Sequence, residues 1–116
     1  MNVETLRDFC LSKTGASESL PFDESTLVFK VGGKMFALLS LDEDLSMNLK
    51  CDPEKAIELR EQYDAIIPGY HMNKQHWNTV IMDGSLPSKL ILGLIDHSYD
   101  LIVESLPRKE KEKLKK

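Results

Sequence analysis

The sequence lacks long apolar runs, paired cysteines and the opening pattern of a secreted protein. No stretch of about 18 apolar residues could span a bilayer, and the first residues lack the basic and apolar blocks of a signal peptide. We therefore expect a cytoplasmic protein that does not associate with membranes. Cys10 and Cys51 match neither a disulfide framework nor a CxxC motif, so we interpret both as reduced core residues.

Positive charge is also scarce, except at the end of the chain. The formal net charge is −4, and residues 108–116 carry six basic and two acidic residues, which leaves −8 for residues 1–107. An acidic body counts against broad nucleic-acid binding unless positive groups gather locally. The alternating Lys-Glu pattern at the end is typical of a solvated terminus. We predict a single domain at residues 1–107, followed by a frayed charged tail at residues 108–116.

Motifs that carry catalysis or bind cofactors are absent too. There is no GxGxxG or Walker sequence, and Asp96-His97-Ser98 cannot act as a triad because successive helical residues point in different directions. His71 and His76 have no third metal ligand nearby in the sequence. We expect no enzymatic activity, no metal and no cofactor, although a small-molecule site around Tyr70, His71 and His76 would be possible if a concave pocket formed there.

Two strands and a turn are the clearest structural pattern. The β-rich runs 26–31 and 34–39 flank Gly32-Gly33, which is typical of a tight hairpin with both turn residues at positive φ. A two-residue turn places Val31 opposite Lys34. The same register places Phe29 opposite Phe36 and Leu27 opposite Leu38 on the core face. Lys30 and Met35 then share the other face.

The remaining elements follow from apolar periodicity and from helix caps. Helices are predicted over residues 2–13 behind an Asn2 cap, over residues 53–63 behind an Asp52 cap, and from about residue 85 to Pro107. Further strands are predicted over 45–51, 65–72 and 77–82. Residues 14–25 are interpreted as a loop because they are polar and contain glycine and proline. The order is α-β-β-β-α-β-β-α. It predicts an α+β fold of two layers, with an antiparallel sheet and helices on one face.

The polar segment from Pro68 to Trp77 is the most function-like feature. It joins two predicted strands and contains Asn73, Lys74, Gln75 and His76. Lysine can neutralise phosphate, asparagine and glutamine can pair with adenine edges, and tryptophan can stack on a base. A purely structural interpretation is equally consistent with these residues, since Trp77 can point into the core and Asn73 can shape a turn.

Five ordered motifs resemble the MmcQ/YjbR family of small bacterial proteins. They are Pro21-Phe22, the hairpin at 28–37, Leu49-Lys50-Cys51-Asp52-Pro53, the segment 68–74 with His76-Trp77, and His97-Ser98-Tyr99-Asp100-Leu101. The resemblance spans almost the whole chain. It implies an α-β3-α-β2-α domain similar to the secretion-chaperone fold, in agreement with the order predicted from periodicity.

The resemblance also implies a function, which is DNA binding through two hairpin loops that act as a double wing. By position, the wings are the Gly32-Gly33 tip and the tip at residues 72–76. The implied contacts are Lys30, Lys34, Lys50, Asn73, Lys74, His76 and Trp77. We expect weak binding by a monomer. The alternative is a protein-interaction module that uses the open sheet face or the edge strand at Pro68.

Overall fold

The computed structural model describes residues 1–20, 25–41, 45–69 and 72–114. Their secondary structure is α1 (Val3–Leu11), β1 (Ser17–Ser19), β2 (Thr26–Val31), β3 (Lys34–Ser40), β4 (Ser46–Lys50), α2 (Pro53–Gln62), β5 (Ile66–Pro68), β6 (Trp77–Ile81), α3 (Ser88–Ser105) and α4 (Arg108–Lys113). No helix in these ranges is long and apolar enough to cross a membrane.

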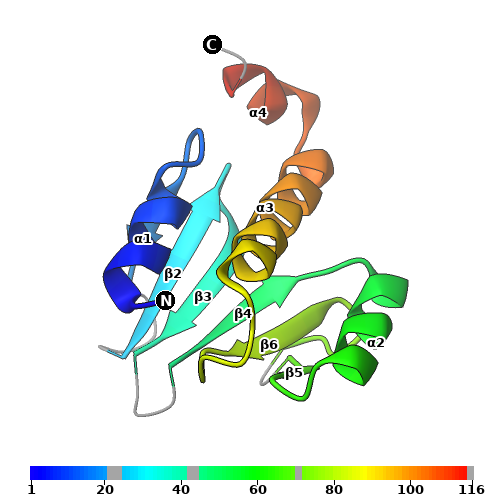
Figure 1. Ribbon diagram of the computed structural model, residues 1–116. Helices are drawn as coiled ribbons and strands as arrows, with labels where there is room; N and C mark the ends of the chain where they lie inside the picture. The colour runs from blue at the N-terminus through cyan, green and yellow to red at the C-terminus, as the bar shows by residue number, and fades with distance from the viewer. Residues whose placement is uncertain (21–24, 42–44, 70–71, 115–116) are drawn as a thin grey trace.

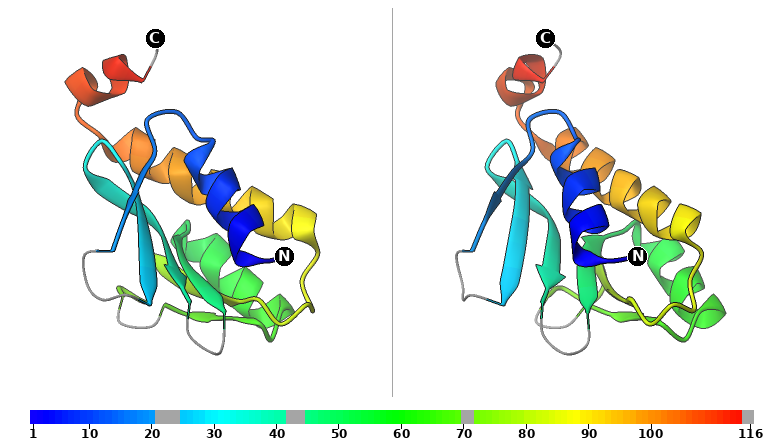
Figure 2. Two further views of the ribbon diagram at one scale, coloured as in Figure 1. Left: turned by 90° about the vertical axis from the view of Figure 1, so that its left-hand side faces the viewer. Right: turned by 60° about the vertical axis from the view of Figure 1, so that its left-hand side comes forward.

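The strands form one antiparallel sheet in the order β1-β2-β3-β4-β6-β5. Helices α1 and α3 cover the same face of the sheet, and α2 lies against β5 and β6 (Figure 1). Figure 2 shows the same arrangement from two further sides. Leu6 of α1, Leu59 of α2 and Ile95 of α3 all belong to one buried core. The predicted α+β class, with helices on one face of an antiparallel sheet, is confirmed.

Two of the three predicted helices begin at the capping residues expected. Asn2 Oδ1 accepts a hydrogen bond from the Thr5 N–H at 2.8 Å at the start of α1. The Asp52 carboxylate accepts one from the Lys55 N–H at 3.2 Å, and Pro53 occupies the first helical position of α2. These local signals therefore define where the two helices begin.

The register of the first hairpin differs from the prediction beyond its first pair. Val31 pairs with Lys34 as expected, but Phe29 pairs with Ala37, because a bulge leaves Phe36 without a partner on β2. The reason lies in the core, where the fully buried Phe36 ring packs edge-on against Tyr99 with centroids 5.3 Å apart. The extra residue shifts every later pair by one position. Leu38 consequently lies on the opposite face from the one predicted.

Strand β1 was also missed, since residues 14–25 were predicted to be a loop. It contains only Ser-Glu-Ser and pairs with β2 at the edge of the sheet. Glu18 points toward the helices, where its carboxylate accepts two hydrogen bonds from the Arg7 guanidinium of α1. A short polar edge strand of this kind depends on such partners and has no apolar alternation of its own.

The C-terminal segment is helical where a frayed tail was predicted. Residues 108–113 form α4, and Leu114 packs against the hydrophobic core. Among the described residues, three ion pairs involve α4: Arg108–Glu112, Lys113–Glu110 and Lys111–Glu104. The Lys-Glu alternation places opposite charges three or four residues apart, where helical side chains meet.

Candidate nucleic-acid interface

The strand register brings the two hairpin tips to the same end of the sheet. At this end β2, β4 and β5 finish while β3 and β6 begin. We call Gly32-Gly33 the first tip and residues 72–76 the second tip. Every candidate contact residue lies in a tip or in the strand residues beside it.

The first tip packs against the end of α3. Gly32 and Gly33 have φ values of 58° and 80°, which confirms the predicted turn. A Cβ on Gly32 would lie only 2.7 Å from Leu106 Cδ1, so the turn and α3 are in close contact. Lys34 Nζ donates to the Ser105 carbonyl at 3.3 Å, and a cation is favourable at this end of a helix. The Lys34 ammonium therefore already has a structural partner.

Lys30 lies beside the first tip on the outer face of the sheet, away from the helices. It is half-buried and stands opposite Met35, as predicted. Ser17 of β1 is its neighbour on the other side. Within the described part of the chain, no carboxylate forms an ion pair with Lys30.

Backbone hydrogen bonds shape the second tip. The Asn73 carbonyl accepts from the His76 N–H at 3.2 Å and from the Trp77 N–H at 2.9 Å. The Asn73 side chain accepts from the Gln75 N–H at 2.9 Å, which is the pattern of an Asx turn. Asn73 thus has a structural role, although the residue is exposed. Lys74 is exposed at the centre of the turn.

Arg60 of α2 anchors the second tip, and nothing in the sequence indicated it. Its Nη2 donates to the Lys74 carbonyl at 3.1 Å, and its Nε donates to the Ala56 carbonyl at 3.2 Å. Gly69 permits the close approach of the two flanking strands, because a Cβ there would lie 2.8 Å from Trp77 Cβ. The backbone of the second tip is therefore held from both sides, while the Lys74 side chain is exposed.

Lys50 and Trp77 are cross-strand neighbours at the base of the second tip. They are paired residues of β4 and β6, and both are half-buried on the outer face of the sheet. The His76 carbonyl accepts from the Cys51 N–H at 2.8 Å, and the His76 side chain is also half-buried. We call Lys50, Asn73, Lys74, His76 and Trp77 the second-tip cluster.

Helix α3 fixes the junction between β4 and α2 behind this cluster. The Ser98 hydroxyl accepts from the Lys50 N–H at 2.9 Å and donates to the Phe36 carbonyl, so it bridges β3 and β4 just beyond their last pair, Ala37 with Leu49. His97 Nε2 accepts from the Asp52 N–H at 3.2 Å, which places the imidazole proton on Nδ1. Burial, followed by the nearby Lys55, lowers the pKa of His97.

A family model described as YjbR matches residues 11–101 of the chain. The chain belongs to the YjbR family. It is 40% identical to the protein YjbR of Escherichia coli over 115 residues, which cover 98% of this chain and 97% of that protein. The Escherichia coli protein YbdF is 34% identical over 113 residues, covering 97% and 93% of the two chains. The family resemblance inferred from the five motifs is thus confirmed.

Solved structures share this YjbR fold. A crystal structure of a Deinococcus radiodurans protein, assigned to domain DUF419, is 41% identical and superimposes with a TM-score of 0.91, covering 97% of this chain and 87% of that one. A crystal structure of a Pseudomonas syringae protein is 31% identical with a TM-score of 0.76, covering 87% and 98%. These names state no substrate or ligand, so the comparisons establish family and fold.

The YjbR-family motif around His97 has a structural explanation. Asp96 forms an ion pair with Lys13, His97 and Ser98 accept the backbone hydrogen bonds described above, and the Tyr99 hydroxyl donates to the Thr14 carbonyl at 2.6 Å. The first three side chains point in different directions, as expected of consecutive helical residues. Together with Tyr99, these side chains connect α3 to the sheet, to the junction between β4 and α2, and to the segment that follows α1.

Metal and thiol chemistry find no support in the residues that the structure describes. No three His, Cys, Asp or Glu side chains in those ranges are grouped to hold a metal ion. Burial raises the pKa of the Cys10 thiol to about 12, and burial also raises that of Cys51, so both thiols stay protonated at neutral pH. Tyr70 and His71, considered for a small-molecule site, lie outside the described residues.

Proposed function

We propose that this YjbR-family protein is a non-catalytic DNA-binding protein that uses the tip end of its sheet. The observation that carries the proposal is a local excess of free positive charge. Lys30, Lys50 and Lys74 form no ion pair within the described ranges, whereas most basic residues of α4 are paired with glutamates. Unpaired lysines can neutralise phosphates without first breaking an existing interaction.

The distribution of acidic residues supports the same surface. The six strands contain one acidic residue, Glu18, and its carboxylate is occupied by Arg7 on the helix side. On the outer face, the strands therefore have lysine side chains and no acidic side chains, although the protein as a whole has a net charge of −4. Local concentration of positive charge is the condition under which an acidic protein can still bind a polyanion.

Within this surface, the second-tip cluster is the main contact. Its backbone is held by Arg60, and the exposed Lys74 side chain forms no hydrogen bond or ion pair with the residues that the structure describes. Lys50 and Trp77 lie side by side at its base, so a phosphate and a base or sugar edge can be contacted together. Lys34 contributes less, because its ammonium is hydrogen-bonded to Ser105.

Fluorescence titration with a DNA duplex tests the proposal, since Trp77 is the single tryptophan of the chain. We expect a fluorescence change at low salt. With about three phosphate contacts, the log–log dependence of affinity on salt should have a slope of about −3. Lys74→Ala should weaken binding several-fold and reduce the slope by about 1.

Lys109→Ala is the matched control. Lys109 is an exposed lysine of α4 that makes no ion pair in the described structure, so its removal changes net charge by the same amount as Lys74→Ala. The control should bind as the wild type does. If neither fluorescence nor electrophoretic mobility changes at low salt, the protein does not bind DNA and the proposal is wrong. If both variants bind equally weakly, the second tip is not the main DNA contact.

A further inference from the structure

A strip of partly exposed side chains crosses the outer face of the sheet beside the two tips. It consists of Lys30 on β2, Met35 on β3, Lys50 on β4 and Trp77 on β6, and we call these four residues the outer strip. Lys30 pairs with Met35, Lys50 pairs with Trp77, and β3 and β4 are neighbours in the sheet. Neighbouring strands lie about 4.8 Å apart, so the outer strip is roughly 15 Å long.

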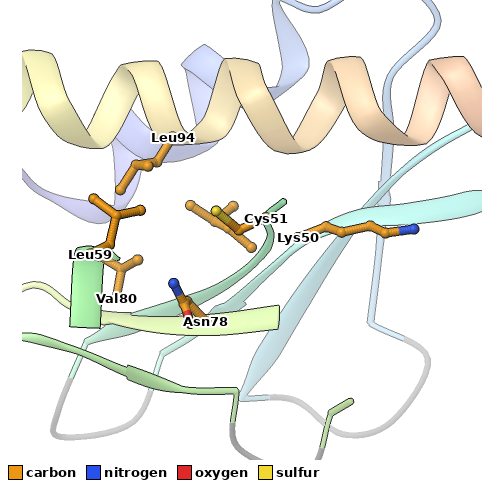
Figure 3. Close-up of a pocket in the computed structure, with 7 residues that line it drawn as sticks. Lys50, Cys51, Leu59, Asn78, Val80 and Leu94 are labelled. Carbon is orange, nitrogen blue, oxygen red and sulfur yellow. The ribbon is translucent and has the colours of Figure 1, made fainter. Parts of the chain in front are cut away.

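A small apolar pocket on the opposite face of the sheet shows where two of these side chains point. Leu49 of β4 and Asn78 of β6 line this pocket together with Leu94 of α3 (Figure 3). Successive residues of a strand point to opposite faces of the sheet, so Lys50 and Trp77 point to the outer face. Figure 3 shows the Lys50 side chain extending away from the pocket.

The outer strip is more accessible than the row of outer-face residues that follows it, further from the tips. That row runs across the same four strands as Val28, Leu38, Asn48 and Thr79. Val28, Leu38 and Thr79 are buried, and the Thr79 hydroxyl donates to the Asn48 side chain. A ligand on this face therefore contacts a strip one residue wide, next to the tips.

Trp77 has a lysine as its neighbour on one side and a glycine on the other. Lys50 of β4 is its partner on the first side. On the β5 side, the Gly69 N–H donates to the Trp77 carbonyl at 2.9 Å, and Gly69 adds no side chain beside the indole. This arrangement allows a base to stack on the indole while the adjacent lysine contacts a phosphate.

We propose that the preferred ligand is single-stranded DNA, which lies along the outer strip with a base stacked on Trp77 and phosphates at Lys50 and Lys30. This inference rests on the proposed DNA binding and specifies the form of the DNA. A base presents its face to an aromatic ring only when it is unstacked, whereas in a duplex neighbouring base pairs cover both faces. Aromatic side chains on an open antiparallel sheet are suited to stacking two or three such bases.

The charge of the outer strip suits the same ligand. Lys30 and Lys50 contribute two positive charges, and the strip contains no acidic residue. Neither lysine forms an ion pair within the described part of the chain. Both ammonium groups are therefore available to phosphates of a strand that crosses β2, β3, β4 and β6.

A comparison of single-stranded with double-stranded DNA tests the inference. The probe is a fluorescein-labelled strand of about 12 nucleotides without self-complementarity, used alone and annealed to its complement, with binding followed by fluorescence anisotropy at low salt. We expect the single strand to bind about tenfold more tightly than the duplex, since stacking on one aromatic ring supplies a difference of this size. If the duplex binds at least as tightly as the single strand, this inference is wrong but the proposed function stands. If neither binds, both are wrong.

Two substitutions of Trp77 test the stacking contact. Trp77→Leu should weaken binding of the single strand about tenfold and leave binding of the duplex unchanged, because only an unpaired base can stack on the ring. Trp77→Phe keeps an aromatic ring and should restore most of the affinity for the single strand. If the folded Trp77→Leu protein binds the single strand as the wild type does, Trp77 is not the stacking residue and the inference is wrong.

A pair of charge substitutions tests the outer strip without altering Trp77. Met35→Glu places a carboxylate beside Lys30 within the strip. Thr26→Glu is the matched control, because Thr26 is a half-buried outer-face residue at the other end of β2 and the change in net charge is the same. We expect Met35→Glu to weaken binding of the single strand several-fold and Thr26→Glu to leave it unchanged. Equal affinities of the two variants would show that the strand does not lie along the outer strip.

Discussion

The two hairpin tips lie at the same end of the sheet, yet they are held by different forces. Apolar contact between Gly32 and Leu106 holds the first tip, and one lysine there is bonded to the end of α3. The second tip is held by hydrogen bonds from Arg60 and within its own backbone. Because main-chain groups carry the structure of the second tip, its side chains remain available to a ligand.

The largest effect is expected at Ser98, which supports Lys50 at the base of the second tip. Ser98→Ala would leave the Lys50 N–H and the Phe36 carbonyl without their bridging partner. Each unpaired buried group costs about 1–3 kcal/mol, so we expect a loss of about 3 kcal/mol in the free energy of unfolding, measured by urea denaturation. Ser88→Ala, at an exposed position of the same helix, is the control. Equal losses in the two variants would contradict the bridging role.

A pair of glycine substitutions tests how the first tip is held. Both glycines have positive φ, which costs a residue with a Cβ about 1 kcal/mol. A Cβ on Gly32 also overlaps Leu106, whereas one on Gly33 meets nothing within 4 Å. We expect Gly32→Ala to lower the free energy of unfolding by about 2 kcal/mol and Gly33→Ala by about 1 kcal/mol. Identical values would show that contact with α3 does not hold the tip.

Arg60→Met tests how the second tip is held. Methionine keeps much of the stem and removes the hydrogen bonds to the Lys74 and Ala56 carbonyls. We expect a loss of about 1 kcal/mol, with faster hydrogen exchange at the His76 and Trp77 amides. Glu61→Gln, at an exposed position of the same helix, should leave exchange unchanged. If Gly32→Ala accelerated these amides as much as Arg60→Met does, the two tips would not be independent.

Local signals in the sequence predicted the parts of the fold that depend on neighbouring residues. The Gly-Gly turn and the caps at Asn2 and Asp52 follow from backbone geometry within a few positions, and all three are confirmed. The bulge at Phe36 depends on packing against Tyr99, far along the chain, so periodicity alone gave the wrong register. Strand β1 depends on pairing with β2 for the same reason.

The candidate site shows the same difference between features set by neighbouring residues and features set by distant ones. Its contact residues could be located from motifs, and topology then brings them to one end of the sheet. The residues that support the site could not be found, because Arg60 reaches a carbonyl 14 positions away and Ser98 reaches groups 48 and 62 positions away. Nothing local distinguishes such an arginine or serine from a solvated one. DNA contact by Lys30, Lys50 and Lys74 remains a prediction.

The smallest expected effect is a pH dependence at the junction that His97 shares with the second tip. His97 must be neutral at Nε2 to accept from the Asp52 N–H, and its pKa in the folded protein is lowered below the ordinary 6.5. The charged groups that act on it are Lys55, Asp52 and Asp100. Below the ordinary pKa the unfolded chain binds more protons than the folded one, so stability rises with pH in this range.

The stabilisation from neutral His97 is therefore complete above about pH 7.5 and is lost as the pH falls through 6.5 toward the lowered folded-state pKa. His97→Gln can still accept from the Asp52 N–H and does not titrate. Melting temperatures of the two proteins, measured between about pH 8 and pH 5, should converge or cross as the pH falls, because only the wild type loses this bond. The first tip has no histidine, so we expect its stability not to change over this pH range. A difference in melting temperature that stays constant from about pH 8 to about pH 5 would mean that the Asp52–His97 hydrogen bond does not depend on the charge of His97.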